Sequence, residues 1–217
     1  MATKTITPTR MELQRLKGRL KTAVRGHKLL KDKRDELMRR FLDNVRLNRK
    51  LRKKVEEGLA QAGAALAVAS AVMSPDMLEQ ALLYPRQSVE LGMTTQNIMS
   101  VYVPVYRFET KGGDESGIYP YGFAQTSGEL DDALSALSRV FQDMLELAQT
   151  EKTTQLLARE IEKTRRRVNA LEYVMIPEMQ TSIRYISMKL EENDRSTKVR
   201  LMKVKDMVLQ DAHHYQE

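Results

Sequence analysis

Apolar residues recur at alternating steps of three and four between Leu13 and Val55, and this repeat constrains the fold more than any other feature of the sequence. Nine of its thirteen positions are apolar over six heptads. A 3.5-residue repeat of that length is typical of a coiled coil. Thr9 and Glu12 have the spacing of a capping box, which predicts the start of the helix. At about 1.5 Å per residue the helix would be about 65 Å long, too long for an ordinary globular domain.

A second apolar repeat starts near another possible capping box, Thr126 with Glu129, and continues to about Leu190. Pro177 lies inside it and cannot donate a helix hydrogen bond, so we expect a kink or local loosening there, where the repeat also changes phase. Two amphipathic arms in one chain most simply pair antiparallel. The expected seam residues are Leu16, Leu20, Leu30, Leu37, Phe41, Leu51, Leu171, Ile183, Ile186 and Leu190.

Four polar residues, His27, Arg34, Asn44 and Asn48, occupy seam positions in the first arm. One interpretation is that they fix the register of the pair or face solvent where the seam opens. A sharper hypothesis is that Arg34 contacts Glu172 of the second arm. A double-mutant cycle that finds no coupling between the two residues would remove this hypothesis.

Glycine and proline gather between the arms: six of ten Gly lie between Gly92 and Gly128, and four of six Pro between Pro75 and Pro120. This density of turn-forming residues predicts a compact insert. Ser74 followed by Pro75 predicts the start of a short helix through Leu83.

After Pro85, two runs rich in β-branched and aromatic residues predict a β-hairpin with its loop near residues 94–97 and with an edge strand at Pro104. The expected fold is therefore mainly α: a long antiparallel two-helix coiled coil carrying a small α+β insert. The expected parts are an N-terminal arm at residues 1–57, the insert at residues 58–128, and a C-terminal arm with a polar tail at residues 129–217.

Charge is distributed unevenly along the chain. Residues 1–57 carry 19 Lys or Arg against 7 Asp or Glu, residues 58–150 carry 4 against 11, and residues 151–217 carry 13 against 11. The triplet at residues 165–167 could be a solvated helix face, or it could contact a partner. The candidate cationic surface consists of Arg25, Lys28, Lys31, Arg165, Arg166 and Arg167.

Several chemistries find no support in the sequence. The chain has no Cys, so it offers no thiolate nucleophile and no Cys-based metal site. Gly58 and Gly63 have the spacing of half a phosphate loop, but Ala64 and Ala65 stand where Lys and Ser or Thr are required. The uncharged residues 58–75 are a poor membrane span, and the Ala-rich run at residues 60–71 within them favours a close helix packing surface. We expect no cofactor, no metal, no catalytic residue and no membrane insertion.

A basic coiled coil could also bind nucleic acid, because a cationic arm attracts any polyanion. Against this alternative, the basic residues run through the heptads rather than preceding them, and Phe41 is the only aromatic residue before Tyr84. A scaffold or cytoskeletal adaptor is a second possibility. Retention of DNA with a steep salt dependence would favour nucleic-acid binding over the scaffold.

Both arms also carry strings that resemble a known family, the D subunits of the V-type and archaeal-type rotary ATPases. The strings keep the order and spacing of that family and cover well over half the chain. They are PTRMELQRLK (8–17), RGHKLLKDKRDELMRRF (25–41), EIEKTRRRVNALEYVMIP (160–177), MKLEEN (188–193) and RLMKVK (200–205), with NIMSVYVPV (97–105) in the insert.

The resemblance implies a central rotor shaft that couples ATP hydrolysis or synthesis to proton or sodium translocation. The coiled coil would stand in a hexameric head of catalytic and regulatory A and B subunits, with the cationic surface facing the head. The insert would meet the F subunit of the rotor and the funnel-like subunit, named C or d, that leads to the membrane ring. The complex would place the chain in the cytoplasm, peripheral to the membrane. Candidates for the partner surface of the insert, or else for its own core, are Val101, Tyr102, Val103 and Tyr106.

Overall fold

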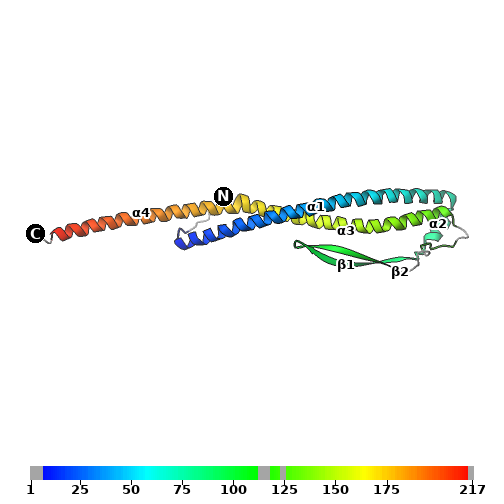
Figure 1. The fold of residues 1–217 in the computed structure, drawn as a ribbon, viewed down its shortest axis with the longest axis horizontal. Helices are drawn as coiled ribbons and strands as arrows, with labels where there is room; N and C mark the ends of the chain where they lie inside the picture. The colour runs from blue at the N-terminus through cyan, green and yellow to red at the C-terminus, as the bar shows by residue number, and fades with distance from the viewer. Residues whose placement is uncertain (1–6, 112–117, 123–125, 215–217) are drawn as a thin grey trace. The chain divides into compact units, whose positions relative to one another are not determined.

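The computed structural model describes residues 7–111, 118–122 and 126–214, and the chain divides into two compact units. One unit comprises Met1–Arg34 with Lys163–Glu217, and the other comprises Asp35–Glu162. The elements are α1 (Arg10–Val72), α2 (Pro75–Leu82), β1 (Ser88–Ile98), β2 (Val101–Lys111), α3 (Gly128–Ala170), η1 (Leu171–Met175) and α4 (Ile176–His214) (Figure 1).

The N terminus of α1 forms where the sequence predicts it. The hydroxyl of Thr9 accepts a hydrogen bond from the backbone N–H of Glu12 at 3.2 Å, which satisfies one of the donors that a helix leaves free at its start. The helix continues to Val72, through the first residues of the expected insert. The second long helix begins at Gly128, and the hydroxyl of Thr126 donates to the carbonyl of Gly122. The capping box expected at Thr126 is therefore not the start of α3.

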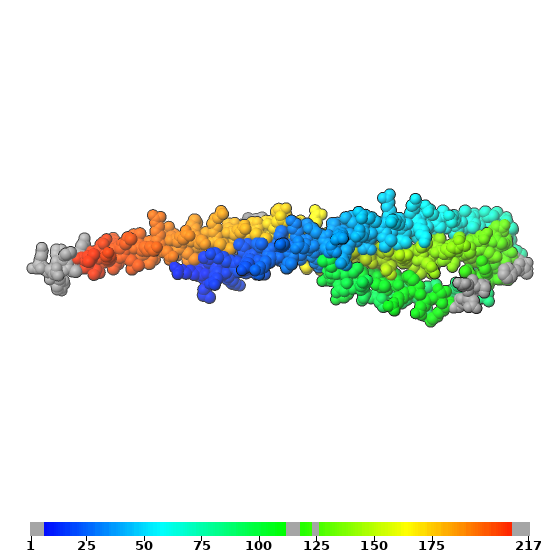
Figure 2. Space-filling view, in the orientation of Figure 1, coloured from blue at the N-terminus to red at the C-terminus, as the bar shows by residue number. Residues whose placement is uncertain are grey.

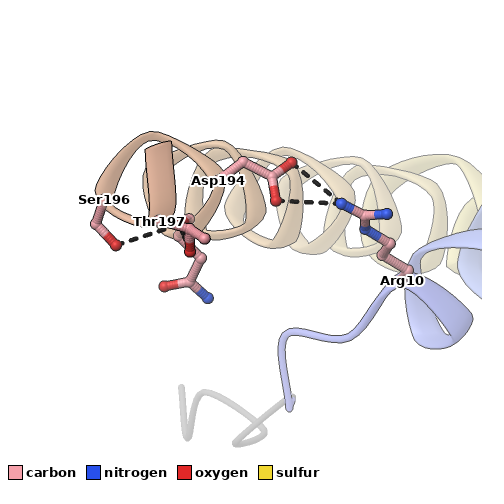
Figure 3. A network of polar contacts seen from close by, with 5 residues as sticks. Arg10, Asp194, Ser196 and Thr197 are labelled. Atoms are coloured by element: carbon pink, nitrogen blue, oxygen red, sulfur yellow. Dashed lines mark hydrogen bonds and ion pairs between the residues drawn. The ribbon is translucent and has the colours of Figure 1, made fainter. Parts of the chain in front are cut away.

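In the unit that contains the chain ends, α1 runs antiparallel to α4. Arg10 donates to both carboxylate oxygens of Asp194 at 3.1 and 3.2 Å, as Figure 3 shows. Further along the pair, His27 Nε2 lies 3.3 Å from Glu172 Oε2. The residue numbers rise on one helix as they fall on the other, which defines the antiparallel direction.

A π-helical turn, η1, interrupts the helix just before Pro177. The backbone N–H of Ile176 bonds to the carbonyl of Leu171, a five-residue span in place of the usual four. The inward-facing positions step by five residues here, from Leu171 to Ile176, and continue to Met179. The wider turn absorbs the extra residue and keeps the apolar seam on one face. The local loosening predicted at Pro177 is confirmed in this form.

In the other unit, α1 and α3 are again antiparallel. Lys54 Nζ lies 2.7 Å from Asp143 Oδ1, and Arg52 Nη2 lies 3.4 Å from Glu151 Oε1. The Ala-rich part of α1 faces inward at the buried Ala62 and Ala69. These residues lie within one continuous helix. The mainly helical fold class with paired long helices is confirmed.

The insert contains the expected hairpin with its turn in a different place. β1 and β2 pair antiparallel from Ser88↔Lys111 to Ile98↔Val101. The turn is Met99 and Ser100, whose φ angles of 51° and 71° are those of a two-residue hairpin loop. The predicted loop at residues 94–97 was wrong, because that polar run lies on the exposed strand β1.

Two small cores hold the insert to the long helices. Val101 and Val103 pack with Leu37, Leu157 and Ile161. The space-filling view shows the hairpin, in green, along one side of the unit formed by Asp35–Glu162 (Figure 2).

The second core joins Ala81 of α2 to Ala69 near the end of α1 and to Leu130 near the start of α3, with Met73 between the two helices α1 and α2. The predicted cap of α2 is confirmed, since the hydroxyl of Ser74 accepts from the N–H of Met77. The short helix therefore forms nearly where the sequence predicts it.

Candidate functional site

The ten predicted seam residues all lie on inward-facing sides of the helices. Leu16, Leu37, Leu51 and Ile186 are buried. The other six are half-buried: Leu20, Leu30, Phe41, Leu171, Ile183 and Leu190. The seam therefore supplies the apolar contact that holds each pair of helix segments together, and it leaves the outward faces for other contacts.

The polar seam residues have distinct environments. His27 is only 21% exposed in its side chain and contacts Glu172, so the ring is held against the start of the π-helical turn. Asn44 donates to the carbonyl of Arg40 in its own helix at 3.0 Å. Arg34 and Asn48 are half-buried. A contact between Arg34 and Glu172 stays a prediction, while the structure pairs the carboxylate of Glu172 with His27.

The six cationic residues singled out from the sequence are all exposed, and all belong to the unit formed by the chain ends. Within the described part of the chain, no carboxylate lies at ion-pair distance from Arg25, Lys28 or Lys31. Residues 13–31 contain seven Lys or Arg and no Asp or Glu. Four of these cations were overlooked in the sequence, although the absence of acidic residues from this run marks them: Arg15, which pairs with Glu12, and Lys17, Arg19 and Lys21.

Several cations further along α1 form ion pairs with carboxylates of the same helix. Arg40 Nε lies 3.0 Å from Glu36 Oε1, and Arg46 Nη1 lies 3.4 Å from Asp43 Oδ1. Lys53 Nζ lies 3.6 Å from Glu57 Oε1. Such exposed pairs contribute little to stability, but they neutralise charge locally. Residues 17–31 of α1 thus present a run of cations for which the described part of the chain supplies no carboxylate at ion-pair distance.

The four residues predicted for the insert surface divide between its core and its outside. Val101 and Val103 are 7% and 3% exposed and form part of the hairpin's own contact with the helices. Tyr106 is half-buried, whereas Tyr102 is 68% exposed.

Sequence reasoning missed further exposed apolar side chains on the same hairpin. These are Val89, Leu91, Met93 and Phe108. The signal was the alternation of apolar residues in the first strand, at positions 89, 91 and 93.

Another exposed apolar group lies near the end of α4. Its seven members are between 50% and 66% exposed: Val199, Leu201, Met202, Val204, Met207, Val208 and Leu209. An isolated helix segment with this many exposed apolar residues is typical of a surface that other proteins cover.

The described residues also bear on catalysis and on membranes. No three of their His, Asp or Glu side chains are gathered closely enough to hold a metal ion. Gly58 and Gly63 are helical, so within the described chain their spacing does not form a phosphate-binding loop. No described helix has a stretch long and apolar enough to cross a bilayer.

Long antiparallel helices and a two-stranded hairpin define a class of protein, the mainly helical proteins that pair two long helices and carry a small α+β insert. The model of the ATP synthase D-subunit family matches residues 12–206. The chain belongs to this family.

Named relatives agree over nearly the whole chain. A V-type ATP synthase D subunit of Acetivibrio thermocellus is 64% identical over 217 residues, which is 100% of this chain and 98% of that protein. A V-type ATP synthase D subunit of Clostridioides difficile is 59% identical over 98% of this chain and 95% of that protein. One of Clostridium botulinum is 57% identical over 94% of each chain.

Proposed function

We propose that this chain is the central shaft of a V-type rotary ATP synthase. It would couple ATP hydrolysis or synthesis in a hexameric head of A and B subunits to the movement of protons or sodium ions across the membrane. The chain itself would be non-catalytic, and it would work in the cytoplasm at the membrane surface as part of the complex. The observation that carries this proposal is the antiparallel pairing of the two chain ends through an apolar seam, in a member of this family.

The pairing suits the transmission of torque. A single helix bends and twists easily, whereas two helices locked along a seam resist both. Buried seam residues such as Leu16 and Ile186 oppose sliding of one helix along the other, because sliding would expose their apolar surface. The seam therefore supports a role in which the two chain ends turn together.

The cationic face suits a contact that must be broken at every step of rotation. Burial of apolar surface contributes about 25 cal/mol per Å², so several hundred Å² would hold the shaft in one orientation. A solvated charge pair at 4 Å contributes only about 1 kcal/mol in water. We infer that Arg25, Lys28 and Lys31, with the triplet at residues 165–167, face the head through many weak contacts of this kind.

The insert would form the permanent contacts of the rotor. We infer that it meets the F subunit and the funnel-like subunit, C or d, that leads to the membrane ring. The exposed Tyr102 and the apolar residues beside it on the hairpin support this assignment, since a static interface can bury apolar surface that a bearing cannot.

Reconstitution tests the proposal. A rotary complex lacking this chain should hydrolyse ATP without moving ions, and adding the chain back should restore coupled ion transport. The triple change Arg25→Gln, Lys28→Gln and Lys31→Gln should lower the coupled rate several-fold. The matched control, Arg39→Gln, Arg46→Gln and Lys53→Gln, removes three cations that already have partners on their own helix and should leave the rate unchanged. Normal ion transport without the chain would refute the assignment.

A further inference from the structure

The two edges of the hairpin differ in how they are occupied. The outer edge of β2 faces α3 at Tyr106. The backbone N–H of Tyr106 points away from β1 and donates to Oε1 of Gln149 on α3 at 2.8 Å. Two residues earlier, Pro104 has no N–H to offer. The part of the β2 edge around residues 104–106 is therefore closed to another strand.

The outer edge of β1 is open. In an antiparallel pair, opposite residues alternate between exchanging hydrogen bonds and pointing their N–H and C=O groups outward. The backbone N–H of Tyr106 points away from β1. The backbone N–H and C=O of its register partner, Met93, therefore point away from β2, toward the outer edge of β1. Because this orientation repeats every second residue, the residues of β1 whose backbone N–H and C=O groups point to the outer edge are Val89, Leu91, Met93, Thr95 and Asn97. Among the described residues, β2 is the only strand that pairs with β1.

Nothing in the sequence of β1 protects this edge. Exposed edge strands are usually blocked by proline, by lysine or by a bulge, because a free row of donors and acceptors invites another strand. β1 is eleven residues long, contains no Pro, Lys or Arg, and has Glu90 as its one charge. Every residue from Ser88 to Asn97 is exposed.

The apolar side chains of β1 at residues 89, 91 and 93 lie on one face of the hairpin. Leu91 and Met93 are 55% and 66% exposed, and their register partner residues are Phe108 and Tyr106, whose rings contact each other. The other face of this part of the hairpin is charged, with Glu90 Oε1 2.6 Å from Lys111 Nζ. The strand thus offers main-chain hydrogen bonds together with an apolar face on alternate residues.

We propose that the edge of β1 accepts a strand from a companion subunit, so that the hairpin becomes a three-stranded sheet. The segment it fits is extended and carries apolar residues at alternate positions that lie on Leu91 and Met93. The identity of the companion rests on the proposed function: it is a subunit that turns with this chain. Main-chain bonds along five residues could not be broken at each step of rotation, which assigns the edge to a static contact.

Amide hydrogen exchange at single-residue resolution tests the proposal. In the isolated chain, the outward amides of Leu91, Met93 and Thr95 should exchange rapidly, while the inward amides of Gly92 and Thr94 are protected. In the assembled rotary complex, the outward amides should slow at least tenfold. Equal exchange of the outward amides in both samples would overturn the added strand.

Two substitutions at one position separate main-chain from side-chain effects. Met93→Pro removes the outward N–H without removing a hydrogen bond of the hairpin, and Met93→Thr keeps that N–H. The proline variant should lose at least tenfold in the affinity of the companion subunit, and the threonine variant should lose much less. Equal affinity of the proline variant and the unaltered chain would contradict the proposal. Met93→Lys, a change at an exposed side chain, should block the strand in the same way and provides a second reading if the proline variant folds poorly.

Other outcomes identify other occupants. A dimer of the isolated chain that Met93→Lys abolishes would assign the edge to a second copy and overturn the proposal. Failure of the chain to enter a rotary complex at all would refute the proposed function, whereas entry without protection of the β1 amides would refute only the added strand.

Discussion

Two glycines in the C-terminal part of α1, Gly58 and Gly63, look alike in sequence and differ in their surroundings. A Cβ on Gly58 would overlap Cγ2 of Val140 on α3, whereas a Cβ on Gly63 would meet nothing within 4 Å. Glycine in a helix interior costs about 1 kcal/mol relative to alanine. The close approach of two helices explains Gly58, while the space around Gly63 leaves it without a packing reason.

Alanine substitution should therefore act differently at the two positions. Gly63→Ala should raise the free energy of unfolding by about 1 kcal/mol, because it removes backbone entropy from the unfolded chain. Gly58→Ala should give no gain or a loss, because Val140 must shift to admit the new methyl group. Chemical denaturation of both variants measures the difference, and an equal gain at the two positions would show that α1 and α3 are not in close contact there.

Tyr121 forms a short hydrogen bond to a carboxylate of α3. Its hydroxyl donates to Asp131 Oδ1 at 2.6 Å, and burial together with this hydrogen bond raises the pKa of Tyr121 above its ordinary value. The folded state therefore holds the phenolic proton more tightly than the unfolded state, whose tyrosines ionise near pH 10. The stability that this supplies is complete below about pH 10 and is lost as the pH rises further.

Tyr121→Phe should lower the free energy of unfolding by about 1 kcal/mol at neutral pH. It should also flatten the loss of stability above about pH 10. Tyr119→Phe is the matched control, because Tyr119 packs beside Tyr121 with a ring separation of 6.2 Å and has no such bond to Asp131. Denaturation curves between pH 7 and pH 11 test both effects. Identical alkaline slopes for the chain and the Tyr121 variant would contradict the role given to this bond.

At the scale of elements, the sequence predicts what depends on local chemistry. The start of α1 at Thr9, the short helix after Ser74 and the loosening at Pro177 each follow from residues a few positions apart. The hairpin turn does not, because Met99 and Ser100 lack the Asn-Gly signature of a tight turn. Their positive φ angles are held in part by Asn97 Oδ1, which accepts from the N–H of Ser100 at 2.8 Å.

The π-helical turn η1 contains one residue more than an ordinary helical turn, so removing one residue there should convert it to α-helix. Deleting the exposed Val174 together with Pro177→Ala shortens the five-residue step to four, so η1 should become ordinary α-helix with the seam intact. The free energy of unfolding should fall by less than about 1 kcal/mol or should rise, since a helix proline is removed as well.

Deleting Gln180, which is also exposed, is the control for the loss of one residue. It should lower stability by about 3 kcal/mol, because Ile183 and Ile186 rotate out of the seam. Circular dichroism with thermal unfolding compares the two deletions. An equal loss of stability would show that the π-helical turn does not serve to keep the seam in phase.

At the scale of the whole molecule, the sequence predicts the pairing of the chain ends but not which surfaces remain free. The heptads specify inward-facing residues, and the ten seam residues lie on those faces. Exposure depends on which side of the hairpin the helices cover, and that depends on tertiary packing. This is why Val103, chosen as a candidate partner residue, is buried, while Leu91 is exposed and was not chosen.

The proposed shaft requires that the two chain ends turn together, and cross-linking tests this directly. The chain has no Cys, so Arg10→Cys and Asp194→Cys would introduce its only thiols, and a short bismaleimide should join them because the side chains at these positions meet at 3.1 Å. This link lies within the chain and should leave ATP-driven ion transport unchanged. The single change Lys28→Cys, with its thiol joined instead to the head, should abolish transport, and cleaving that linker should restore it. Full transport with the chain fixed to the head would be incompatible with a rotating shaft.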